Sequence, residues 1–61
     1  MNSSSAKERR ALIMRQLEQK EEVVVTELSR ETGISEVTIR KDLTILQNRN
    51  LLIRTRGGAM R

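Results

Sequence analysis

The feature that most constrains the fold is a three-residue break, residues 33–35, between two segments that both have helical character. Residues 25–32 fit one helix, and Gly33 can end it because glycine adopts the left-handed conformation at little cost. Ser35 is a good N-cap for the next helix, because its hydroxyl can accept a hydrogen bond from the first turn. Two helices joined by so short a turn predict a helix-turn-helix, which we place at about residues 25–44.

The second helix of this pair is expected to run from residue 36 to about residue 49. Three aliphatic residues fall within about 60° of one another on its helical wheel and form a buried stripe: Ile39, Leu43 and Leu46. The opposite face and its flanks carry cations, hydroxyls and one small apolar group: Val37, Thr38, Arg40, Lys41 and Thr44. Such a face predicts contact with the major groove of DNA, because cations bond guanine O6 and N7 and a methyl group can meet the thymine methyl.

An ordinary solvated face is the alternative interpretation of these residues. Solvated helix faces more often carry Glu and Gln beside their Lys, whereas the only acid between residues 37 and 50 is Asp42. We expect Asp42 to anchor an arginine inside the protein, because a carboxylate facing DNA would repel the phosphates. The sequence does not indicate which arginine.

The remaining segments complete one small domain, residues 6–61, behind a polar lead, residues 1–5, that we expect to be disordered. Residues 6–19 are good helix formers without Gly or Pro and predict a first helix. Residues 23–25 are a β-branched run and predict a short strand. The expected fold is mainly α with a small β-hairpin, a winged helix-turn-helix of three helices plus a wing.

The expected wing covers about residues 51–61, with Gly57-Gly58 as the hairpin turn. Arg54 and Arg56 flank this turn, and arginine at a hairpin tip can enter a narrow minor groove. Gly57 would let the backbone approach another molecule without interference from a Cβ. A glycine turn with solvated cations is the alternative, but beside a helix-turn-helix we favour contact with DNA.

The charge is unevenly distributed along the chain, which carries 12 basic and 8 acidic residues, a net charge of +4. Residues 1–20 sum to +3, residues 21–36 to −4 and residues 37–61 to +5. Basic stretches of this kind favour a polyanionic partner such as nucleic acid. Arg9 and Arg10, near the start of the first helix, could contact backbone phosphates or only solvate that helix.

The composition excludes several functions for this chain of 61 residues, which is a single module. It has no Cys and no His, so it cannot form a disulfide, a thiolate or imidazole metal site, or a Ser-His or Cys-His nucleophile. We expect no catalysis, no cofactor and no metal. The longest apolar runs are three residues, too short to cross a bilayer, and we expect a cytoplasmic protein.

The run from residue 27 to residue 43, which contains Ser-x-x-Thr-Ile-Arg-Lys-Asp-Leu, is followed by Arg-Thr-Arg-Gly-Gly-Ala at residues 54–59. Together with Glu-Arg-Arg at residues 8–10, these segments resemble the N-terminal winged helix-turn-helix of DeoR-family bacterial transcriptional regulators. The resemblance covers residues 8–59 and implies a DNA-binding module, typically of a repressor of sugar or nucleoside catabolic operons. It also implies a C-terminal domain, absent from this chain, that binds a phosphorylated sugar and assembles homo-oligomers.

By the family pattern, the positions expected to contact DNA are Ser35, Thr38, Arg40 and Lys41. The chain departs from the pattern at four positions. Glu21 and Asn50 stand where the family often has glycine, Val24 stands where a Ser or Thr usually starts the second helix, and Arg56 stands where a His is often found. None of these departures removes a group that would face DNA. They therefore bear on local stability more than on function.

Two functions from different classes remain open on the sequence. The first is sequence-specific binding of double-stranded DNA. The second is a protein-interaction or oligomerisation adaptor whose basic surface meets an acidic protein, suggested by apolar residues outside the core stripes: Leu12, Ile45 and Leu51. A mobility-shift assay with random duplex DNA at low salt separates them.

Overall fold

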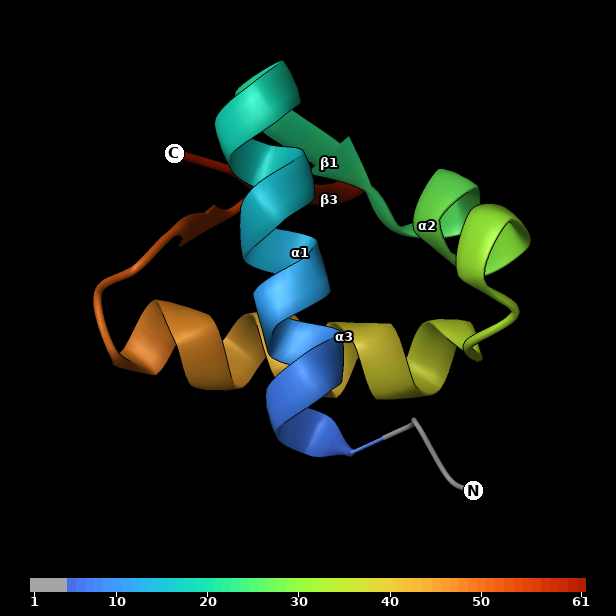
Figure 1. The fold of residues 1–61 in the computed structure, drawn as a ribbon. Coiled ribbons are helices and arrows are strands. Elements are labelled where there is room, and N and C mark those ends of the chain that lie inside the picture. Colours follow the sequence, from blue (N-terminus) through green and yellow to red (C-terminus); the bar gives the residue numbers. More distant parts are fainter. Residues whose placement is uncertain (1–4) are drawn as a thin grey trace.

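Three helices and a small antiparallel sheet make up the computed structural model, which describes residues 5–61 (Figure 1). The elements follow one another as α1 (Ala6–Lys20), β1 (Glu22–Val24), α2 (Val25–Thr32), α3 (Glu36–Asn48), β2 (Ile53–Arg54) and β3 (Gly58–Met60). The prediction of a mainly helical, winged helix-turn-helix fold is confirmed. The predicted disordered lead lies outside the described residues, except for Ser5.

The three helices begin and end where local chemistry favours it. Ser5 caps α1 by accepting a hydrogen bond from the Glu8 backbone N–H (3.1 Å). Gly33 ends α2 in the left-handed conformation (φ 77°). Val24 precedes α2 without a side-chain cap, as its departure from the family pattern suggested. The first N–H of α2, on Val25, is instead satisfied by the carbonyl of Gly57 in the wing (2.9 Å).

The core is aliphatic and lies where the three helices meet one face of the sheet. The predicted stripe of α3 is buried, as are Ile13 and Leu17 of α1. The sheet and the residue directly before β2 add three further buried side chains: Val23, Ala59 and Leu52. Ile34, in the turn between α2 and α3, packs partly buried against this cluster. Because α3 turns its aliphatic stripe inward, its opposite face is left to solvent.

The sheet has the strand order β1-β3-β2, so the wing is paired to the strand that precedes the helix-turn-helix. The two strands of the wing, β2 and β3, are shorter than the hairpin predicted at residues 51–61. Gly58 also belongs to β3 and not to the turn. The Thr55 N–H donates to the Gly58 carbonyl (3.0 Å), which closes a two-residue loop of Arg56 and Gly57. The turn therefore lies one residue earlier than predicted, because Gly58 pairs with Val24 of β1.

Glu21 occupies a left-handed conformation (φ 66°) at the end of α1, where the family often has glycine. A side chain with a Cβ is strained there by about 1–2 kcal/mol relative to glycine. We therefore expect Glu21→Gly to raise the free energy of unfolding by about 1 kcal/mol, after the greater freedom of glycine in the unfolded chain is deducted. The melting temperature should rise by about 4–8 °C.

Glu21→Gln is the matched control, because it removes the same charge and keeps the strained conformation. It should leave the melting temperature nearly unchanged. A lower melting temperature for Glu21→Gly than for Glu21→Gln would contradict the assignment of strain to this position.

Candidate nucleic-acid interface

The outward face of α3 carries a row of side chains that we call the α3 ridge: Val37, Lys41, Thr44 and Asn48. All four are exposed, and Val37 keeps 61% of its surface accessible. Within residues 5–61 the ammonium of Lys41 forms no ion pair or hydrogen bond. A free cation beside an exposed methyl-bearing side chain is the combination that major-groove recognition uses.

Asn48 is the member of the α3 ridge that the sequence interpretation omitted. It lies only about 20° from both Val37 and Lys41 on the helical wheel, so its position could have been read from the helical period. Its amide has a donor and an acceptor side by side, and such a group can bond adenine N6 and N7.

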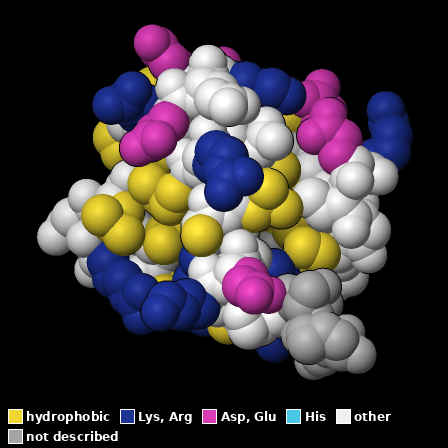
Figure 2. All heavy atoms as spheres, viewed as in Figure 1, with side chains coloured by type: hydrophobic (Ala, Val, Ile, Leu, Met, Phe, Trp, Pro, Cys, Tyr) yellow, Lys and Arg dark blue, Asp and Glu magenta, His cyan; other side chains and the backbone are white. Residues whose placement is uncertain are grey.

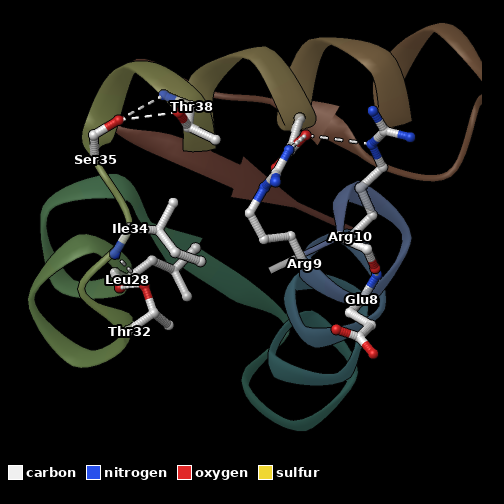
Figure 3. Close-up of polar contacts among 10 residues, drawn as sticks. Glu8, Arg9, Arg10, Leu28, Thr32, Ile34, Ser35 and Thr38 are labelled. Atoms are coloured by element: carbon white, nitrogen blue, oxygen red, sulfur yellow. Dashed lines mark hydrogen bonds and ion pairs between the residues drawn. The ribbon is translucent and has the colours of Figure 1, made fainter. Parts of the chain in front are cut away.

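The start of α3 is held by a reciprocal pair of side chains, Ser35 and Thr38 (Figure 3). The Thr38 N–H donates to the Ser35 hydroxyl oxygen (3.2 Å), and the Ser35 hydroxyl donates to that of Thr38 (3.0 Å). In the turn before them, the Thr32 hydroxyl donates to the Leu28 carbonyl (2.6 Å) and accepts from the Ile34 N–H (3.2 Å). These bonds fix the direction in which α3 leaves the turn, and its N-terminus carries the partial positive charge that suits a phosphate.

Arg40 lies on the flank of the α3 ridge and is exposed. Its Nη2 donates to a carboxylate oxygen of Glu36 one turn earlier (2.9 Å), and both side chains are at least 40% accessible. Exposed pairs of this spacing contribute only about 0.3–0.5 kcal/mol. The pair therefore holds Arg40 close to the face of α3 without preventing it from exchanging Glu36 for a phosphate.

Arg54 lies in β2, away from the hairpin tip, and folds back onto α3. Its Nη1 donates to the Thr44 hydroxyl (3.0 Å), and its backbone N–H donates to the Gln47 side-chain carbonyl (2.7 Å). Thr44 in turn donates to the carbonyl of Arg40 (3.1 Å). The Nε of Arg54 is buried and has no hydrogen-bond partner among the described residues. Two residues predicted to contact DNA, Thr44 and Arg54, are thus joined to each other on one side of the ridge.

The hairpin tip consists of Arg56 and Gly57, both exposed. The Arg56 side chain forms no ion pair or hydrogen bond with any described residue. Of the two arginines predicted in the wing, Arg56 is therefore the one at the tip and free to meet a partner.

Asp42 is the one buried charged side chain among the described residues (1% accessible), and it pairs with both Arg9 and Arg10 (Figure 3). Arg9 donates to its two oxygens (2.6 and 3.1 Å), and the Nε of Arg10 donates at 3.3 Å. The prediction that Asp42 anchors an arginine is confirmed, and it anchors two. Phosphate contact by Arg9 and Arg10 stays a prediction.

The environment of Arg9 keeps it charged. Its hydrogen bond to Asp42 raises the pKa of Arg9, partial burial lowers it, and the negative charge of Asp42 raises it further. The net change is upward from a value that is already high, so Arg9 remains protonated at every pH at which the domain can be studied. Its pairing with Asp42 does not depend on its own titration.

Figure 2 shows how the charges are distributed over one face of the molecule. Most acidic side chains in this view lie in its upper half, over the end of α1, β1 and α2, as the acidic residues 18–36 require. Basic side chains gather at the lower left, on the side of α1 where Figure 1 shows the C-terminal half of α3. The acidic part of this face therefore lies apart from α3.

Two other features are absent from residues 5–61. Their Asp and Glu side chains do not gather in groups of three or more that could hold a metal ion. We also find no helix in this region whose length and hydropathy would let it span a bilayer.

Comparison with known proteins agrees with this geometry. A family model described as the DeoR-like helix-turn-helix domain matches residues 9–61. The chain is 43% identical over 53 residues to the "Putative aga operon transcriptional repressor" of Escherichia coli O157:H7, covering 87% of this chain and 20% of that protein. It is 46% identical over 52 residues to the "Uncharacterized HTH-type transcriptional regulator FruR" of Bacillus subtilis (strain 168), covering 85% of this chain and 21% of that protein.

The chain thus spans about a fifth of the length of these curated relatives. The comparison with solved structures gave no significant match. The family match covers the helix-turn-helix, the wing and most of α1, which together form nearly all of the described fold. The chain therefore belongs to the DeoR-like helix-turn-helix family, the DNA-binding domains of transcriptional regulators.

Proposed function

We propose that this chain binds double-stranded DNA sequence-specifically by placing the α3 ridge in the major groove and the hairpin tip against the backbone or the minor groove. The observation that carries the proposal is the free ammonium of Lys41 in the middle of an exposed ridge that faces away from the core. The family pattern adds Ser35, Thr38 and Arg40, which lie at the start and flank of the same helix. Such a domain is a binding module and performs no catalysis.

The proposed biological role is repression of sugar or nucleoside catabolism genes in the bacterial cytoplasm. The resemblance implies it, and one relative is named as a transcriptional repressor of the aga operon. The intact protein would carry a C-terminal domain that binds a phosphorylated sugar and forms homo-oligomers. Two modules could then bind half-sites about one helical turn apart, so the single chain should bind more weakly than the intact protein.

Lys41→Ala tests the proposed role of the α3 ridge. The probe is the duplex that this chain enriches from a random-sequence pool. A base contact contributes about 1–3 kcal/mol of discrimination, so affinity for this duplex should fall about fivefold or more. The melting temperature should not change, because Lys41 is exposed and makes no polar contact with residues 5–61. Fluorescence anisotropy at one salt concentration measures the affinity.

Lys20→Ala is the control, because it also removes one exposed lysine from a helix but lies at the far end of α1. It should weaken binding much less than Lys41→Ala. Equal affinities for the wild type and Lys41→Ala would show that α3 does not read the bases.

An adaptor that binds another protein is the second candidate, and one observation favours it. The outward side of the wing exposes three large apolar side chains: Leu51, Ile53 and Met60. Ile53 and Met60 are cross-strand partners, so they form a continuous apolar patch. Failure of the chain to shift random duplex DNA at low salt would favour this role over DNA binding.

A further inference from the structure

An open hollow of about 490 Å³ lies between the first half of α1 and the C-terminal half of α3. Its base is aliphatic and its rim is cationic. It is lined by Lys7, Arg10, Ala11, Met14, Leu46 and Arg49. We call it the basic hollow.

Two of the three cations of the basic hollow have no ion-pair partner among the described residues, and the third, Arg10, is paired with Asp42. Asp42 accepts two hydrogen bonds from Arg9 and one from the Nε of Arg10. Arg10 keeps 23% of its side chain accessible, and its outer nitrogens form no other bond within residues 5–61. The side chains of Lys7 and Arg49 are exposed and make no polar contact with any described residue. The rim therefore presents two fully free cations and a third that is held in place by Asp42.

The position of the basic hollow relates it to the α3 ridge. Arg49 lies about 80° around the helix from Lys41, on the flank that faces α1. The opposite flank is covered by the wing, because Gln47 and Thr44 bond Arg54. In Figure 1, α1 crosses α3 and its first turns continue past α3 on the side away from β1 and β3. The ridge is thus bordered by the wing on one side and by the basic hollow on the other.

We propose that Lys7, Arg10 and Arg49 bind phosphates of one DNA strand beside the major groove, while Arg56 faces the other side of the groove. The inference rests on the proposed function and assigns the backbone contacts that orient α3. DNA phosphates are favoured over a free anion because three cations are spread along an open hollow that continues the flank of the recognition helix. Contacts of this kind position a protein on DNA without reading its sequence.

The test is the salt dependence of binding by the double variant Lys7→Ala/Arg49→Ala. The slope of log K against log salt is negative, and each lost phosphate contact reduces its magnitude by about 0.9. The slope of the double variant should therefore be less steep than that of the wild type by about 1.8. The loss of affinity should be similar for the enriched duplex and for a random duplex. Arg10 is left in place, because it supports Asp42 and its removal would disturb folding. Anisotropy titrations between about 50 and 200 mM salt give the slopes.

Lys20→Ala/Arg30→Ala is the matched control, since it removes one lysine and one arginine that are exposed and lie away from the basic hollow. Its slope should stay close to that of the wild type. A second double variant, Lys7→Gln/Arg49→Gln, removes both charges but keeps long polar side chains. It should show the same reduction in the steepness of the salt dependence if the charge is responsible. Equal slopes for Lys7→Ala/Arg49→Ala and the control would overturn the proposal.

Two further outcomes separate this proposal from the proposed function. A wild-type chain that binds duplex with a steep salt dependence, together with an unchanged slope for the double variant, would overturn only the phosphate contacts. A wild-type chain that binds no duplex would overturn both.

Saturable binding of inorganic phosphate at Lys7 and Arg49, seen by NMR with the DNA slope unchanged, would assign the hollow to a free anion and overturn the phosphate contacts.

Discussion

Gly58→Ala is expected to lower the free energy of unfolding by about 3 kcal/mol, the upper end of the usual cost of overpacking. A Cβ on Gly58 would overlap the backbone carbonyl oxygen of Val23 and lie 3.0 Å from the Cα of Val24. These are backbone atoms of the paired strand β1, so they cannot move aside as a flexible side chain would. A domain of this size has a total stability of only about 3–9 kcal/mol, so the change should remove between a third and all of it. The melting temperature should fall by about 12–24 °C, at about 4–8 °C per kcal/mol.

Gly57→Ala provides the matched control, because no atom lies within 4 Å of the place where its Cβ would be. Among the described glycines only Gly33 has a positive φ, so alanine at position 57 meets no backbone strain either. Thermal unfolding followed by circular dichroism should give Gly57→Ala a melting temperature near that of the wild type. Equal melting temperatures for the two variants would contradict the close approach of β3 to β1.

Asp42→Asn is expected to cost about 2–3 kcal/mol. Breaking a buried ion pair usually costs about 3–5 kcal/mol, because a charge is left uncompensated. Here the remaining charges belong to Arg9 and Arg10, whose side chains are about a fifth accessible and can partly turn to water. The asparagine NH₂ would also face guanidinium donors with no acceptor to meet it. The melting temperature should fall by roughly 10 °C or more, at about 4–8 °C per kcal/mol.

Glu36→Gln is the control for this change, because it makes the same replacement of carboxylate by amide on the same helix. Its ion pair with Arg40 is exposed, so the loss should stay within about 0.5 kcal/mol. Urea titration of both variants measures the difference. A destabilisation of Asp42→Asn no larger than that of Glu36→Gln would show that the buried pairs contribute nothing to the packing of α1 on α3.

The sequence patterns predicted the parts of the fold that depend only on residues close together in the chain. Gly33 ends a helix and Ser35 starts one because their own backbone and hydroxyl favour it, and the structure has both. The aliphatic stripe of α3 follows from the helical period alone. For the same reason the exposed position of Lys41 could be predicted without knowledge of the rest of the fold.

The parts that could not be predicted depend on register and on contacts between distant segments. Arg54 pairs with Ala59, which is buried, and cross-strand partners point to the same face of a sheet. Arg54 therefore points towards α3, and a shift of one residue would have turned it outward. A predicted strand without a register could not decide between these directions.

Asp42 shows the same limit for long-range pairs. Repulsion between a carboxylate and DNA phosphates indicated that Asp42 would meet an arginine inside the protein, but the partners are 32 and 33 residues away on α1. The angle at which α1 crosses α3 selects them. The need for glycine at position 58 likewise arises from the approach of β1, which the local turn pattern does not reveal.

Contact between the α3 ridge and DNA is tested most directly by NMR titration of the chain with the duplex that it enriches from a random pool. We expect the largest changes in amide shift along residues 35–48 and at Arg56, and small changes along residues 18–31. Changes concentrated instead at Leu51, Ile53 and Met60, with residues 35–48 undisturbed, would contradict binding of DNA through α3.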